Sequence, residues 1–265
     1  MLHKYFSSSS IVAAALATVA CVGLAGAASA GIIYQDSFSG TNTTPLNGAA
    51  PTVDNGTSLT WTAGSAWADS GYTNTATGRW NASLAFTPVN GQIYTLSAGL
   101  DMTGPGSSPN GNDWLAIGFM NTQNTNTAFD ANYQNSSQPA AADPWVQSAL
   151  GGAGGTVFTG PGTAGNQGFA NAVGVNTYSI VLNTGSSAWA YNVYLTNSNV
   201  TNKLVGTGAV ETTPGITAVG LENGLGVGEV SNFSLTDVAV PEPASLGLLT
   251  AGGLGLLLLK RRKAV

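Results

Sequence analysis

Few residues are available for catalysis once the two ends of the chain are set aside. The only histidine is His3 and the only cysteine is Cys21, so residues 31–240 contain neither type. Such a body cannot build a Ser-His-Asp or Cys-His nucleophile, or a zinc site based on histidine. The common nucleophilic and zinc-dependent hydrolases are therefore excluded.

Paired carboxylates are the catalytic option that remains, because glycosidases use two Asp or Glu side chains. Glu222 and Glu229 flank a glycine-rich segment, and a long loop separates Asp101 from Asp113. No predicted strand carries two closely spaced acids, so we interpret these carboxylates as surface groups that keep the protein soluble. We predict that the protein is not an enzyme, with glycoside hydrolysis as an alternative.

Oxygen ligands for calcium are also present. Asn110, Asn112 and Asp113 lie close together, and Asp36 lies near the start of the body. Calcium takes six to eight oxygen ligands, and the spacing of an EF-hand is missing. An Asn-Gly turn is the simpler interpretation, so calcium is unsupported and no cofactor is predicted.

Aromatic side chains could act as platforms on which sugars stack. Trp67, Trp80 and Trp145 lie near polar or proline-containing segments, so they are the better candidates for the surface and for glycan contact. Partial burial is the simpler interpretation even for these three. Trp114 and Trp189 lie in strand-like runs and are predicted to be core residues.

The elements that must position these residues are short strands. Runs rich in Val, Ile, Thr, Tyr, Phe and Trp recur between clusters of Gly, Asn, Pro and Ser, and no helical period is evident. About ten strands without helices predict an all-β antiparallel β-sandwich or jelly roll. Loops are expected at 103–113, 120–143 and 147–176. The predicted strands are 32–38, 59–62, 84–86, 93–102, 114–119, 156–159, 178–183, 188–196, 216–221 and 229–236.

Two of these strands carry informative patterns. In 188–196, Trp189, Tyr191, Val193 and Leu195 fall on one face, as expected for a strand with one buried face. The segment 114–119 is almost entirely apolar, which predicts a central strand covered on both sides.

Charge limits the partners of the body. Only Arg79 and Lys203, of seven Lys and Arg residues, lie in 31–240, together with eleven of the twelve acids. This surface repels phosphate backbones, so no nucleic-acid partner is predicted.

The first thirty residues have the features of a secretory signal peptide, expected to be a helix. A short basic start precedes an apolar run at 11–25, and the small residues Ala28 and Ala30 provide a cleavage site before Gly31. The predicted organisation is therefore a signal peptide at 1–30, an extracellular β-sandwich at 31–240 and a tail at 241–265.

The tail has three parts. Pro241, Glu242 and Pro243 precede an apolar stretch at 244–259, which is predicted to be a transmembrane helix. A basic cluster that should stay cytoplasmic follows and consists of Lys260, Arg261, Arg262 and Lys263.

In all three parts and their order, this tail resembles the PEP-CTERM sorting domain of Gram-negative bacteria that make exopolysaccharide. The resemblance implies processing by an exosortase that recognises Pro241, Glu242 and Pro243. The body resembles concanavalin-like and laminin-G-like jelly rolls in segments 34–38, 113–119, 216–220 and 230–235. The resemblance of the body to these jelly rolls implies a β-sandwich fold but no particular ligand.

Together these features predict an exported, non-catalytic protein of the cell surface or exopolysaccharide matrix, anchored in the membrane at least transiently. Its predicted partners are an exosortase-type enzyme and extracellular polysaccharide. The alternative is a lectin-like carbohydrate-binding module. The ligand, the cleavage of the tail, its final anchored or released state and the oligomeric state do not follow from the sequence.

Overall fold

The computed structural model describes residues 29–73, 79–102, 114–120, 142–149, 154–158, 167–210, 215–224 and 228–240. Every regular element in these ranges is a β-strand, and the strands form two antiparallel sheets. The predicted β-sandwich is confirmed. The predicted signal helix and transmembrane helix lie outside the described residues.

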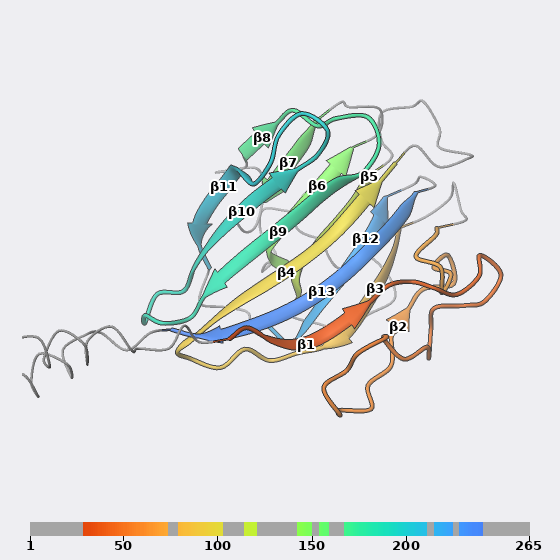
Figure 1. Cartoon of the computed structure of the whole chain (residues 1–265), viewed down its shortest axis with the longest axis horizontal. Coiled ribbons are helices and arrows are strands. Elements are labelled where there is room, and N and C mark those ends of the chain that lie inside the picture. The colour runs from red at the N-terminus through yellow and green to blue at the C-terminus, as the bar shows by residue number, and fades with distance from the viewer. Residues whose placement is uncertain are drawn as a thin grey trace, which may run out of the picture. The chain divides into compact units, whose positions relative to one another are not determined.

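The six-stranded sheet contains both ends of the folded body. Its front position in Figure 1 makes the order of its strands easy to follow. In that order the strands are β1 (Gly31–Asp36), β13 (Glu229–Ala239), β4 (Gln92–Asp101), β9 (Asn176–Asn183), β10 (Ala190–Thr196) and β11 (Lys203–Ala209).

The seven-stranded sheet forms the second layer (Figure 1). Its order is β2 (Thr62–Ala63), β3 (Arg79–Ala85), β12 (Ala218–Gly224), β5 (Trp114–Met120), β6 (Ala142–Ala149), β7 (Gly155–Phe158) and β8 (Gln167–Phe169).

The main core lies between the two sheets and follows from the period of two along each strand. In β10, Tyr191, Val193 and Leu195 are buried, while Ala190 is exposed, as the alternation predicts. Every residue of β5 is buried, so the prediction of a central strand covered on both sides is confirmed.

Several strand predictions were incomplete. β6 and β8 fall largely within segments expected to be loops, and β11 was not predicted. Only Thr62 and Ala63 pair as β2, where a longer strand at 59–62 was expected. The sequence of β6 begins Ala-Asp-Pro, which reads as a turn, and β11 contains two glycines.

The edges of the two sheets are joined on the side of β8 and β11. The side-chain amide of Gln167 donates a hydrogen bond of 2.7 Å to the carbonyl oxygen of Thr207 and accepts one of 3.2 Å from its backbone N–H. An edge strand exposes unpaired backbone groups, and this amide satisfies one pair of them on β11.

Residues 30–239 form one compact unit. The predicted domain boundaries at residues 30 and 240 stay predictions. In the described ranges no helix is long and apolar enough to cross a membrane.

Candidate functional site

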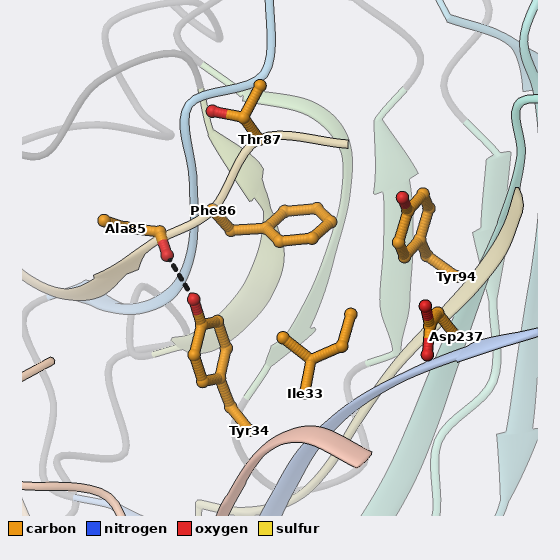
Figure 2. A pocket seen from close by; sticks show the side chains of 7 residues that line it. All are labelled: Ile33, Tyr34, Ala85, Phe86, Thr87, Tyr94 and Asp237. Carbon is orange, nitrogen blue, oxygen red and sulfur yellow. Dashed lines mark hydrogen bonds between the residues drawn. The ribbon is translucent and has the colours of Figure 1, made fainter. Parts of the chain in front are cut away.

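A pocket of about 380 Å³ lies beside β1, β4 and β13, next to the end of β3. Figure 2 shows its walls, which consist mainly of aromatic rings. Its lining residues are Ile33, Tyr34, Ala85, Phe86, Thr87, Tyr94 and Asp237.

Hydrogen bonds fix the two tyrosines of this pocket. The hydroxyl of Tyr34, on β1, donates a bond of 2.7 Å to the carbonyl oxygen of Ala85 at the end of β3 (Figure 2). This bond ties the six-stranded sheet to the seven-stranded one. The hydroxyl of Tyr94, on β4, accepts a bond of 2.9 Å from the backbone N–H of Val89.

Phe86 fixes the orientation of the Tyr94 ring. The two rings meet edge to face, with centroids 5.0 Å apart and planes at 76°. Phe86 also contacts Phe119 of the core, with a centroid separation of 6.1 Å. The aromatic wall is therefore continuous with the buried core.

The pocket lining contains three hydroxyl groups and one carboxylate but no basic side chain. Burial raises the pKa of Tyr34, and the charge of Asp54 adds to this effect. Burial also raises the pKa of Tyr94; the hydrogen bond from Val89 opposes the rise and the charge of Asp237 adds to it. Both phenols therefore keep their protons at neutral pH. Asp237 supplies acceptor oxygens on β13, and Thr87 supplies an exposed hydroxyl.

A second cluster of buried apolar residues lies on the face of the seven-stranded sheet that points away from the main core. The rings of Trp145 and Phe158 stack with centroids 3.8 Å apart and planes at 6°. The Trp114 ring lies 6.2 Å from Trp145. We call this set the outer cluster, which consists of Trp114, Ala116, Met120, Trp145, Phe158 and Ala218.

Glu222 lies on the same face and is completely buried. It pairs in register with Asn81 of β3 and Ala116 of β5. The interpretation of the acids as solubilising surface groups is therefore wrong for Glu222, because alternation along β12 turns Leu221 into the main core and Glu222 onto the outer face. Glu229 is exposed on the other sheet, and Asp113 lies outside the described residues.

The structure does not bring together the three tryptophans predicted to contact glycans. Trp67 is 1 % exposed and belongs to the main core, where its indole N–H donates to the carbonyl oxygen of Trp80 at 2.9 Å. Trp80 is half-buried against the same core, and Trp145 is 1 % exposed in the outer cluster. The expectation of surface exposure is wrong for Trp67 and Trp145. The expected core residue Trp189 is only partly buried.

Asp36 accepts protein hydrogen bonds on both carboxylate oxygens. Its Oδ1 accepts from the N–H of Phe38 at 2.9 Å, and its Oδ2 accepts from the indole N–H of Trp61 at 2.7 Å. No group of three or more His, Cys, Asp or Glu that could hold a metal occurs in the part of the chain that the structure describes. The prediction that no cofactor is needed stays a prediction, and residues 110–112 lie outside the described ranges.

The residues predicted to direct sorting cannot be placed in the fold. Only Ala30, exposed just before β1, belongs to the described residues. The others lie outside them, and they are Ala28, Pro241, Glu242, Pro243, Lys260, Arg261, Arg262 and Lys263.

Sequence reasoning missed the pocket. Tyr34, Phe86, Tyr94 and Asp237 are far apart in the chain, and no short motif connects them. Alternation could have indicated that Tyr34 and Tyr94 point inward. The pairing of β13 with β1 and with β4, which brings the two tyrosines to Asp237, has no signal in the sequence.

Comparison with known proteins identifies the tail. Residues 239–263 match the family model described as the PEP-CTERM protein-sorting motif. A search of curated proteins found no significant match.

The folded body is similar to several β-sandwich structures. An endo-1,3-beta-glucanase from Streptomyces sioyaensis is 14 % identical, with 79 % of this chain and 97 % of that chain covered at a TM-score of 0.49. The exoplasmic/lumenal domain of VIP36, bound to Ca2+ and Man3GlcNAc, is 11 % identical over 69 % of this chain and 87 % of that chain, at 0.42. The CBM2 module of the evolved Dit of Lactobacillus casei BL23 phage J-1 is 11 % identical over 82 % and 99 %, at 0.39.

The glucanase match corrects the prediction that the protein is not an enzyme. Structures similar to this chain include a glycoside hydrolase as well as lectins, and enzyme status is not established. The predicted resemblances to PEP-CTERM tails and to concanavalin-like β-sandwiches are confirmed. The chain therefore carries a PEP-CTERM protein-sorting motif behind a β-sandwich domain.

Proposed function

We propose that this protein is exported, cut by a signal peptidase after Ala30, and sorted by an exosortase-type enzyme to the cell surface or the exopolysaccharide matrix. The observation that carries the proposal is the sorting motif at 239–263. Pro241 and Pro243 keep the recognition segment extended, because proline disfavours helix in its own and the preceding residue. The apolar stretch at 244–259 then spans the bilayer, with the basic cluster on the cytoplasmic side.

Intact mass of the protein recovered from cells tests this sorting step. Cells with the exosortase should yield a chain that lacks residues after the Pro-Glu-Pro segment, and cells without it should yield a longer chain. Replacing residues 241–243 with alanine should give the longer chain in both strains, and Glu229→Gln should be processed normally. A chain that retains 246–265 in both strains would contradict exosortase processing.

For the folded domain, we propose binding of one sugar unit of an extracellular polysaccharide in the pocket shown in Figure 2. Phe86 and Tyr94, which are 7 % and 3 % exposed, form the inner wall of the pocket and leave a small apolar surface for the C–H groups of a sugar. Asp237 offers acceptor oxygens, and the Tyr94 hydroxyl can donate its own hydrogen while it accepts from Val89. A volume of about 380 Å³ lies within the range of small-ligand sites.

The expected ligand is a neutral sugar, because the pocket lining offers hydroxyl and carboxylate oxygens and contains no basic side chain. A uronic acid or a phosphorylated sugar would place a second negative charge beside Asp237. This preference distinguishes the pocket from a general affinity for acidic exopolysaccharide.

Glycan arrays followed by calorimetry test the pocket. Thr87→Trp fills the mouth of the pocket with a large ring from an exposed position, and Val89→Trp places the same ring on the same loop at a residue outside the lining. We expect Thr87→Trp to weaken binding at least tenfold and Val89→Trp to leave it unchanged. Equal affinity in both variants, or no neutral-sugar ligand on the array, would exclude this site.

Glycoside hydrolysis is the second candidate, favoured by the buried Glu222 on the face that carries Trp114 and Trp145. Glycosidases need two carboxyl groups, and Glu222 is the only one on this face among residues whose side chains the structure describes. Release of reducing ends from a 1,3-β-glucan or from the cognate exopolysaccharide, abolished by Glu222→Gln but not by Glu229→Gln, would establish hydrolysis.

A further inference from the structure

Both ends of the folded body leave it at the same place. β1 begins at Gly31, which pairs in register with Asp237 on β13, and β13 ends two residues later at Ala239. Ser29 and Ala30 are exposed, and the compact unit begins at Ala30. The predicted cleavage point therefore coincides with the first paired residue of the domain.

The Asp237 carboxylate faces this first residue closely. A Cβ built on Gly31 would lie 2.8 Å from Oδ1 of Asp237, closer than real side chains approach. The backbone nitrogen lies about 2.5 Å from that Cβ position, so the nitrogen and Oδ1 are within about 5.3 Å of each other. Any residue other than glycine here would have to push the carboxylate away.

We propose that signal removal creates a binding partner for Asp237: the α-ammonium group of Gly31 in the processed chain, which forms an ion pair with this carboxylate and fixes the end of β1. The inference rests on the proposed cleavage after Ala30. Hydrolysis of the Ala30–Gly31 peptide bond consumes one water molecule. Hydroxide adds to the carbonyl carbon of Ala30 and a proton goes to the nitrogen of Gly31; the released carboxylic acid then ionises and the new amine is protonated.

Positive charge is scarce elsewhere in the body. Arg79 begins β3, whereas the pocket lies at the opposite end of that strand, and Lys203 is exposed on the far edge strand β11. The charged residues of the strands beside Asp237 are acids at their distant ends, namely Asp36, Asp101 and Glu229. In a body with two basic residues and eleven acids, neither basic residue lies on a strand next to β13, so the new ammonium is the cation that the described strands bring beside Asp237.

The ion pair would stabilise the end of β1, which is weakly held. β1 is an edge strand, held on one side only by β13, and its register shifts between Ile32 and Tyr34. Tyr34 belongs to the pocket, so fraying at Gly31 would disturb a wall of the proposed sugar site. The unprocessed chain has a neutral amide at this position and lacks the ion pair.

The first test is N-terminal sequencing of the exported protein, which should begin at Gly31. Four proteins, each with the tail retained and kept in detergent, then measure the effect of the ion pair. Two start at Gly31 and two start at Ser29, and one of each two carries Asp237→Asn. In the Gly31 chain at low salt, we expect the substitution to speed hydrogen exchange of the β1 amides about two- to fivefold, the range of an exposed ion pair. In the Ser29 chain the substitution should change hydrogen exchange less than it does in the Gly31 chain, because the ammonium has moved two residues away.

Salt provides an independent check, since about 1 M salt screens exposed charges beyond roughly 3 Å and should remove most of the difference. A start other than Gly31, or equal effects of the substitution in both chains, would overturn the pair. Neither readout needs a glycan or an exosortase. A start other than Gly31 would also contradict the proposed cleavage after Ala30. Equal effects of the substitution in both chains would leave the sorting and sugar-binding proposals standing, and the failure of those proposals would leave the exchange result intact.

Discussion

The indole N–H of Trp61 donates a hydrogen bond of 2.7 Å to the carboxylate of Asp36, and neither side chain is more than 4 % exposed. The Trp61 ring also meets Phe233 edge to face, with centroids 5.1 Å apart. A single buried acid thus joins β1 to the segment before β2 and to an aromatic contact with β13.

Asp36→Asn should lower the free energy of unfolding by about 1–3 kcal/mol. Both carboxylate oxygens accept hydrogen bonds, and an amide places an NH₂ group opposite one of those donors. Urea denaturation would measure the change, with the exposed Glu229→Gln as control. If both variants lose equally little, the buried acceptors are not stabilising.

The same residue should give stability a recognisable pH dependence. Burial raises the pKa of Asp36, although hydrogen bonds from Phe38, Trp61 and Thr52 oppose the rise. A group whose pKa is higher in the folded protein contributes its stability fully below the unfolded value, about 3.9, and loses it as pH rises through the folded pKa. The stability of the parent relative to Asp36→Asn should therefore increase as pH falls from 7 toward 4. A difference independent of pH would show that Asp36 has its ordinary pKa.

Thr184→Val should destabilise the domain by about 1–3 kcal/mol and weaken the proposed sugar site. The hydroxyl of Thr184 lies 2.7 Å from the carbonyl oxygen of Val89 and accepts a bond of 3.0 Å from the N–H of Gln92, so it holds the loop that carries Thr87. Thr177→Val, at a half-buried position on β9, is the matched control. Thermal unfolding measures the first effect, and calorimetry with the ligand found on the array measures the second. Indistinguishable results for the two variants would rule out this role of the loop.

Gly220→Ala should be more damaging than Gly168→Ala. A Cβ at Gly220 would overlap the carbonyl oxygen of Ala82 and lie 2.7 Å from the sulfur of Met120, whereas one at Gly168 meets nothing within 4 Å. Overpacking of this kind costs about 1–3 kcal/mol. The midpoints of denaturant unfolding of the two variants measure this difference. If Gly220→Ala leaves the midpoint unchanged, β3 and β12 can move apart at no cost in stability.

Tyr178 should keep its proton at pH values at which exposed tyrosines ionise. Burial raises the pKa of its hydroxyl, which donates to Oδ1 of Asn171 at 2.7 Å, while bonds with Ser148 and Asn171 partly oppose the rise. Its stabilising contribution is therefore present through neutral pH and is lost only as pH rises through that elevated pKa. In an ultraviolet titration, Tyr178→Phe should remove absorbance change only from the step that accompanies unfolding. Loss from the early step near pH 10 would contradict this burial.

Sequence patterns predicted the strands whose side chains alternate or are uniformly apolar, such as β10 and β5. They missed β11 because Gly206 and Gly208 interrupt its pattern. A Cβ at Gly206 would lie 2.7 Å from Val157 of the opposite sheet, so the fold requires a small residue where the pattern requires a large one. β6 was missed because Pro144, at its start, indicates a turn.

The candidate sites were harder to predict than the strands. Glu222 resembles a surface acid because Asn223 and Gly224 follow it, and only the register with β3 and β5 reveals its burial. Trp67 was misjudged for the same reason, since polar neighbours in the chain do not reveal a ring that folds inward. The sorting tail was predictable because its signal is contiguous.

The position of β13 between the edge strand β1 and β4 has a mechanical consequence if the C-terminal tail anchors the protein as proposed. β13 pairs with β1 on one side and with β4 along nearly its whole length on the other. Ladder hydrogen bonds lie perpendicular to the strands, so a pull along β13 from Ala239 loads many of them at once in shear instead of opening them one after another. If the proposed anchoring through the tail holds, drag from flowing water or a moving matrix would therefore be resisted by these ladder hydrogen bonds together.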